Sequence, residues 1–146
     1  MSRVSCINTP NASKPILSST GAMPYSHCTV AAGLIFLTGQ VGLPASDPTA
    51  IVRGGAYAET TEALKNVAAI LAAAGSDLEH VLRCEVYLMD LDRDFDGFNK
   101  AWIEAFAEHR PASAVMQIAG LGMGACVEIV CTAAVMSRGA VNSHMA

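Results

Sequence analysis

Residues 111–137 constrain the fold most, because this long stretch carries a single charged side chain, Glu128. Residues 114–118 and 126–135 are rich in Val, Ile, Met and Cys, and a glycine-rich segment, AGLGMGA, lies between them. Short apolar runs bounded by glycine are typical of buried strands. The sequence therefore predicts two buried strands joined by a tight loop.

Glu128 is the first candidate for a functional residue. A carboxylate in an apolar run is costly unless its lost hydration is compensated. No Lys or Arg lies in sequence between Arg110 and Arg138. Glu128 therefore requires a distant cation, for example from another subunit, or a bound proton, or a chemical role.

The composition indicates one oligomeric domain. A chain of 146 residues can bury a sufficient hydrophobic core without disulfides or bound metals. Only 15% of the residues are charged, whereas a monomer's surface usually carries roughly a quarter to a third. We therefore expect a homo-oligomer.

The longest apolar run, residues 67–74, is far shorter than the roughly 20 residues of a membrane span. The start of the chain lacks the apolar core of a secretory signal, so the prediction is a cytoplasmic protein that does not bind membranes.

Charge and cysteine patterns exclude other classes. The nine cations are scattered and the net charge is −4, so the basic patch of a nucleic-acid binder is missing. The five cysteines contain no CxxC motif and sit mostly in apolar runs. We expect no metal, no cofactor and no nucleic acid, and a small molecule as the partner.

Periodicity then gives the order of elements. Apolar spacing of three and four predicts a helix over residues 57–74, with Glu59 mostly off its apolar stripe. The elements expected are strands at 24–30 and 34–41, that helix, a strand at 82–90, a helix over 95–106, and the two strands above. The second helix carries Phe95, Phe98, Trp102 and Phe106 at helical spacing, so we expect these rings to supply most of one core face. This β-β-α-β-α-β-β order predicts an α+β domain with one sheet and both helices on one face. Residues 1–20 are expected to be an extended lead-in, 21–136 the domain, and 137–146 a flexible tail.

Several short motifs in this order resemble the RidA family, also called YjgF or L-PSP, of trimeric imine and enamine deaminases. They are PYS (24–26), LTGQ (37–40), the AAG that ends the first helix, VYLMD (86–90), the FN pair at 98–99, HRPA (109–112) and GACVEI (124–129). The resemblance implies the chorismate-mutase-like fold with one mixed sheet. It also implies a homotrimer that holds its small-molecule ligand at subunit interfaces.

The chain departs from the family at the substrate clamp, which makes it a divergent member. Ser113 stands where the family's deaminases have the arginine that holds the substrate carboxylate. A hydroxyl cannot replace a permanently charged, bidentate guanidinium, and losing one partner of such a pair costs about 2–5 kcal/mol of binding. Val115 replaces a frequent Cys, and Gly120 and Met123 replace a basic pair. We therefore do not expect the usual small 2-imino acids as substrates.

The resemblance also assigns the remaining site residues. Glu128 is implied as general base and then general acid, with a pKa above that of ordinary members because no arginine is near. Tyr25 is implied as a second catalytic residue, although a packed ring is an equal alternative. The substrate-binding residues implied are Thr38, Gly39, Asn99, Ser113, Val115 and His27. For Asn99 a backbone-bonding role, and for His27 an ordinary place on a strand, are the alternatives.

The leading hypothesis is a RidA-like hydrolase that deaminates reactive imines, enamines or related unsaturated intermediates. The alternative is a non-catalytic trimer of the same fold that binds a small ligand. Ribonuclease activity, also attached to the family, is less favoured because the chain is acidic and lacks a basic groove.

Overall fold

The computed structural model describes residues 3–14 and 24–136. The predicted tail and part of the predicted lead-in lie outside these residues. In chain order the elements are β1 (Ser5–Ile7), β2 (Cys28–Ala31), β3 (Leu34–Leu37), β4 (Gln40–Val41), α1 (Gly55–Ala73), the 3-10 helix η1 (Leu78–His80), β5 (Val81–Leu88), α2 (Leu91–Phe106), β6 (Ala112–Gln117), the 3-10 helix η2 (Gly122–Gly124) and β7 (Val127–Ala134).

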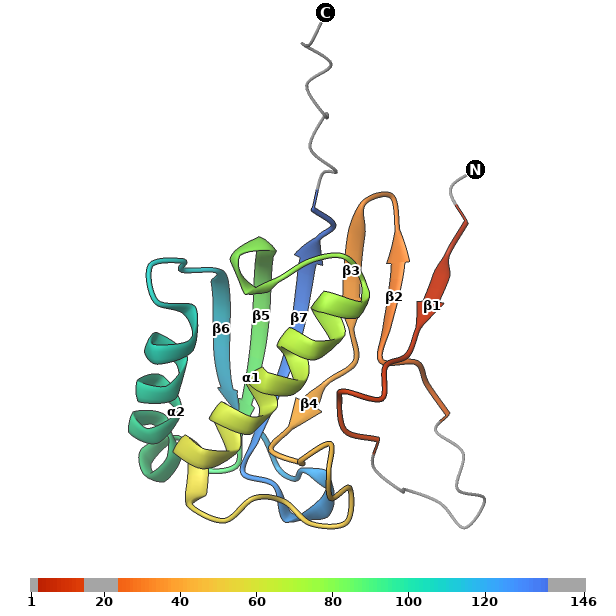
Figure 1. Ribbon diagram of the computed structural model, residues 1–146. Coiled ribbons are helices and arrows are strands. Elements are labelled where there is room, and N and C mark those ends of the chain that lie inside the picture. The colour runs from red at the N-terminus through yellow and green to blue at the C-terminus, as the bar shows by residue number, and fades with distance from the viewer. Residues whose placement is uncertain (1–2, 15–23, 137–146) are drawn as a thin grey trace, which may run out of the picture.

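The strands form one mixed sheet in the order β1-β2-β3-β7-β5-β6, and β4 also pairs with β7. β5 and β6 run parallel, and every other pair is antiparallel. Both helices cover the same face of this sheet (Figure 1). The predicted α+β class is therefore confirmed, with its single mixed sheet and one-sided helical layer.

The N-terminal segment and the second predicted strand differ from expectation. Residues within the predicted lead-in form β1, which pairs with β2 through Ser5 opposite Val30 and Ile7 opposite Cys28. The predicted strand over 34–41 is interrupted after Leu37, and its last part forms the separate strand β4. This break brings Thr38 and Gly39 beside the beginning of β7, because β4 pairs with Ile129 and Glu128.

The expectation of two buried strands joined by a tight loop is wrong in two respects. β5 lies between β6 and β7, so the strands are not neighbours. β6 forms an edge of the sheet and its residues are exposed or half-buried in the protomer. Both strands are apolar, but only β7 is covered within one chain.

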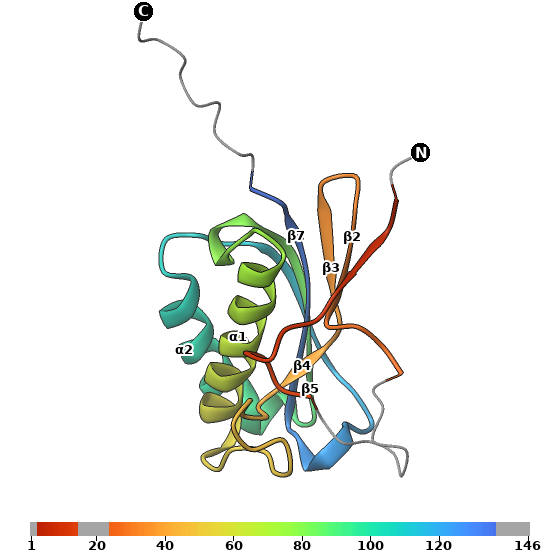
Figure 2. The same ribbon diagram turned by 45° about the vertical axis from the view of Figure 1, so that its right-hand side comes forward.

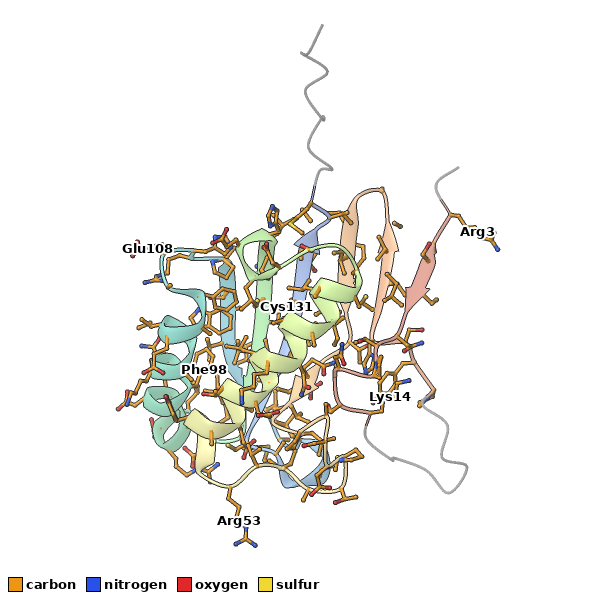
Figure 3. All side chains as sticks on the ribbon, in the orientation of Figure 1. Arg3, Lys14, Arg53, Phe98, Glu108 and Cys131 are labelled. Carbon is orange, nitrogen blue, oxygen red and sulfur yellow. The ribbon has the colours of Figure 1, made fainter. Side chains whose placement is uncertain are left out.

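The core lies between the sheet and the helices. Val127, Ile129, Cys131 and Ala133 alternate along β7 toward this layer, and Figure 3 shows Phe98 and Cys131 within it. The apolar stripe predicted for α1 is buried as expected. On α2, the rings of Phe98, Trp102 and Phe106 stack in sequence at centroid distances of 5.3 and 4.5 Å.

One aromatic prediction is wrong. Phe95 was expected in the core with the other α2 aromatics, but it is 40% exposed. It lies at the outer border of the ring stack and contacts Phe98 at a centroid distance of 6.1 Å. The helical period alone does not show where the apolar stripe of a helix stops facing the sheet.

The second face of the sheet carries no helix of the described chain (Figures 1 and 2). Alternation along β7 places Glu128 and Thr132 on this face. Thr132 pairs with Phe36, and Glu128 pairs with Tyr87, which in turn pairs with Met116. Phe36 and Met116 are 47% and 38% exposed, so this face presents apolar surface around an acid.

Arg3, Lys14 and Arg53 lie at the periphery on separate segments (Figure 3), so they form no basic patch together. In the part of the chain that the structure describes, neither helix is long and apolar enough to cross a membrane.

Candidate functional site

A cavity of about 280 Å³ lies where the start of β7 meets β4 and the η2 turn. This volume is near the lower end of the range for small-molecule sites, about 300–1,000 Å³. Its lining residues are Tyr25, Thr38, Gly39, Val41, Gly122, Met123 and Glu128. The structure thus brings together four residues that the sequence singled out, namely Glu128, Tyr25, Thr38 and Gly39.

Among the residues that the structure describes, Glu128 is the only charged one in the cavity lining. It lies between Val41 of β4 and Tyr87 of β5 in the strand register, and it is half-buried. Among the described residues it makes no ion pair. Burial raises the pKa of its carboxyl above the ordinary value near 4.5.

Gly39 allows the carboxylate to approach the backbone. A Cβ atom at this position would overlap Oε1 of Glu128 and lie 2.9 Å from its Cδ. Any other residue would displace the acid from its place. The sequence predicted Gly39 as a binding residue, and the structure adds this packing requirement.

Tyr25 and Thr38 lie on two chain segments that hydrogen bonds join. The Thr38 hydroxyl donates to the Ser26 carbonyl at 2.7 Å, and the Thr38 N–H donates to the His27 carbonyl at 3.0 Å. These bonds fix the segment that carries Tyr25 beside the cavity. Burial, and then the charge of Glu128, raise the pKa of the Tyr25 phenol. Tyr25 is therefore a protonated donor near the acid.

His27 does not line the cavity. It is 1% exposed, its Nδ1 accepts a hydrogen bond from the Thr9 N–H at 3.1 Å, and its Nε2 lies 2.9 Å from the Ser13 carbonyl. A carbonyl can only accept, so Nε2 carries the proton and the ring is held as one neutral tautomer. In the described protomer, both ring nitrogens bind the N-terminal segment and none faces a ligand.

Asn99, Ser113 and Val115 also lie outside the lining of this cavity. Asn99 is half-buried on α2. Ser113 and Val115 are on the edge strand β6, which β5 separates from β7. A ligand in this cavity would meet them only if they came from another protomer.

Glu59 is a buried polar residue whose role the sequence did not reveal. It was predicted mostly off the apolar stripe of α1, but it is 6% exposed. Its Oε2 accepts hydrogen bonds from the Cys126 N–H at 2.7 Å and the Val127 N–H at 3.3 Å. Glu59 thereby fixes the beginning of β7, directly before Glu128. A Cβ atom on Gly42 would lie 2.6 Å from the Glu59 Cα, so α1 packs closely on this segment.

Asn66 supports the neighbouring loop from the same helix. Its Nδ2 donates to the Leu43 carbonyl at 2.8 Å and its Oδ1 accepts from the Ser13 N–H at 3.1 Å. Glu59 and Asn66 are seven residues apart, so they share one face of α1. Two polar residues at this spacing next to an apolar stripe were the signal that could have located both.

Cys126 is not a nucleophile in this arrangement. Burial, followed by its hydrogen bond to Glu59 and the charge of Glu59, raises the pKa of its thiol to about 12. The thiol is therefore protonated at neutral pH and unreactive. In the part of the chain described, no group of three His, Cys, Asp or Glu side chains is placed to hold a metal ion.

A second hollow of about 290 Å³ lies between α1 and α2. Its lining residues are Thr61, Leu64, Lys65, Ala68, Leu78, Ala101, Glu104 and Ala105. Glu104 accepts a hydrogen bond from Tyr57 at 2.7 Å on the exposed side. This hollow has no buried acid, so the cavity at Glu128 is the candidate site.

The fold and the cavity define a class of small α+β proteins with one mixed sheet, a single helical layer and an acid at the start of a central strand. A sequence model described as endoribonuclease L-PSP matches residues 17–135. The human protein named 2-iminobutanoate/2-iminopropanoate deaminase is 37% identical over 108 residues, which cover 73% of this chain and 76% of the relative. The Drosophila melanogaster RutC family protein UK114 is 36% identical over 127 residues, covering 87% and 86%.

Solved structures agree. RidA from the Antarctic bacterium Psychrobacter superposes with a TM-score of 0.80 at 27% identity, covering 90% of this chain and 99% of that one. An endoribonuclease-like protein from Thermotoga maritima gives a TM-score of 0.80 at 28% identity, covering 91% and 98%. The chain belongs to the RidA/YjgF/L-PSP family, as the sequence motifs predicted.

Proposed function

We propose that this protein is a hydrolase that deaminates reactive imines or enamines, and that Glu128 is its acid/base residue. The observation that carries the proposal is the position of Glu128: a carboxyl group with a raised pKa and no cation partner in the described chain, facing a cavity of small-molecule size. The human relative at 37% identity is named as a deaminase of two small imines.

In the proposed reaction, water adds to the carbon of a C=N bond. The Glu128 carboxylate accepts a proton from this water as the new C–O bond forms and passes it to the nitrogen, which gives a tetrahedral amino alcohol. Glu128 then takes the proton of the new hydroxyl group and delivers it to the nitrogen, the C–N bond breaks, and a carbonyl compound and ammonia leave. Tyr25 would orient the substrate by donating from its protonated phenol.

We further propose that the protein is a homotrimer and that neighbouring protomers complete each site. Phe36 and Met116 are exposed on the sheet face that carries Glu128. Exposed apolar surface of this kind indicates a protein–protein interface. Asn99, Ser113 and Val115 lie outside the cavity of their own protomer. A neighbouring edge strand β6 could bring them to the ligand. The five cysteines are free, which agrees with the proposed location in the reducing cytoplasm.

The usual small 2-imino acids are not the proposed substrates. No Lys or Arg of the described ranges 3–14 and 24–136 lines the cavity, and Ser113 stands where family deaminases have an arginine. To test this, an amino-acid oxidase would generate 2-imino acids while keto-acid release is followed for the wild type and Ser113→Arg. We expect release to accelerate only with the arginine variant. Equal acceleration by the wild type would contradict the proposed loss of carboxylate binding.

A non-catalytic trimer that binds a small ligand is the second candidate, favoured because the lining residues that the structure describes include no cation. No turnover of any imine, together with thermal stabilisation by a ligand, would support it. The net charge of −4 argues against the ribonuclease function contained in the family's description.

A further inference from the structure

Met123 occupies an unusual backbone position in the wall of the cavity. Its φ and ψ are 60° and 15°, in the left-handed region that favours glycine. It stands between Gly122 and Gly124, and Gly124 also has a positive φ of 74°. Thus a long side chain stands at the position of this turn where a glycine would be less strained. Strained positions of this kind often occur where a side chain serves a ligand.

The Met123 side chain is available to a ligand. It lines the cavity together with Glu128, and it is 37% exposed, so the protomer's own core does not enclose it. A thioether on a flexible chain adapts to irregular apolar shapes. Val41 adds a second apolar side chain, and Gly39 and Gly122 add none. Together Met123 and Val41 form an apolar wall beside a single acid.

This pairing selects against anionic ligands. A ligand carboxylate would meet the Glu128 charge, and the described part of the chain places no Lys or Arg in the cavity lining. An uncharged ligand with an apolar substituent would instead bury that substituent against Met123 and Val41. The polar end of such a ligand would face Glu128 and the Tyr25 hydroxyl.

We propose that Met123 is a specificity-determining residue, and that the ligands of this site are uncharged imines, or their carbonyl products, which carry an aliphatic or aromatic group and no carboxylate. The imine part of this inference rests on the proposed deaminase function. The preference for an apolar, uncharged ligand is a property of binding and can be measured without turnover.

The test uses two stable compounds with one carbon skeleton, 4-methyl-2-oxopentanoate and 4-methyl-2-oxopentanamide. Each is titrated into the full chain labelled with 13C at the methionine methyl groups, and Met123→Leu identifies the Met123 signal. We expect the amide to shift this signal and to bind roughly tenfold or more tightly than the acid. Met123→Lys should reverse the order, because the ammonium attracts the carboxylate and removes the apolar wall.

Two further variants keep the test independent of folding. Met123→Gly relieves the left-handed backbone and removes the thioether, so it should be at least as stable to heat and should bind the amide roughly fivefold or more weakly. Met136→Lys changes another methionine of similar exposure, 40%, just after β7, and should leave both affinities unchanged.

Equal binding of acid and amide by the wild type, or binding of neither, would overturn the inference. So would an order of affinities that Met123→Lys does not change. Preferential binding of the amide without hydrolysis of the matching neutral imine would support the role of Met123 in specificity. The same result would contradict the proposed deaminase function.

Discussion

The carboxylate of Glu128 lies so close to Gly39 that a methyl group on Gly39 would overlap its Oε1 atom. Gly39 is not in the left-handed region, so the glycine is required by this close approach and by no turn. The break between β3 and β4 places Gly39 there. A residue with no obvious chemistry thus decides where the acid of the site can stand.

We expect Gly39→Ala to lower deaminase activity by roughly tenfold or more, because the added methyl displaces the carboxylate from the cavity. Gly120→Ala is the matched control, since a Cβ at Gly120 meets nothing within 4 Å. Initial rates of ammonia release from a neutral imine would be compared. Full activity in Gly39→Ala would show that the position of the acid is not critical.

We expect Glu128→Gln to lower turnover by roughly a hundredfold or more, since an amide cannot accept the proton from water. The wild-type rate should rise with pH through a midpoint above 4.5, because burial raises the pKa of Glu128 and only its ionised form is the base. A profile that is flat from mildly acidic to neutral pH would exclude Glu128 as the base.

Glu128 should also make the fold less stable at neutral pH. Its pKa is raised in the folded state, so the folded protein holds the proton more tightly than the unfolded chain. The resulting stabilisation is complete below the ordinary pKa near 4.5 and is lost as pH rises through the raised value. Thermal unfolding should therefore find Glu128→Gln more stable than the wild type at pH 7 and equal to it at pH 4. The opposite order would mean that the carboxylate has a stabilising partner in the assembly.

Glu59→Ala should destabilise the protein by about 1–3 kcal/mol, because the N–H groups of Cys126 and Val127 lose their acceptor in the interior. Glu59→Gln keeps an acceptor oxygen and should cost less. Glu62→Ala removes only the exposed pair with Lys65, so its effect should stay within about 0.5 kcal/mol. Denaturant unfolding measures all three, and equal losses for Glu59→Ala and Glu62→Ala would contradict the role given to Glu59.

Phe36→Asp should dissociate the proposed trimer, because it places a charge on the apolar face of the sheet that carries Glu128. Phe95→Asp changes a ring of similar exposure on α2, away from that face, and should leave the trimer intact. Analytical ultracentrifugation would report the mass of each. A wild type that sediments as a monomer, or a trimeric Phe36→Asp variant, would exclude this interface.

The sequence by itself determined the family and the α+β class, and it singled out Glu128 as the carboxylate to examine. Alternating apolar residues predicted β5, a continuous apolar run predicted β7, and the three-four spacing predicted α1. Glu128 stood out as the only charge in a long apolar stretch. These features are local, because the spacing of apolar residues along a strand or helix shows which of its faces is buried.

Only the tertiary structure decided what each face packs against. It placed β5 between β6 and β7, turned Phe95 outward, buried Glu59 against the start of β7, and held both nitrogens of His27 on the N-terminal segment. It also brought Tyr25, Gly39 and Met123 around Glu128. The physical reason is that strand pairing and buried polar contacts join segments that are far apart in the chain. The sequence around a residue therefore does not show which distant residue it will contact.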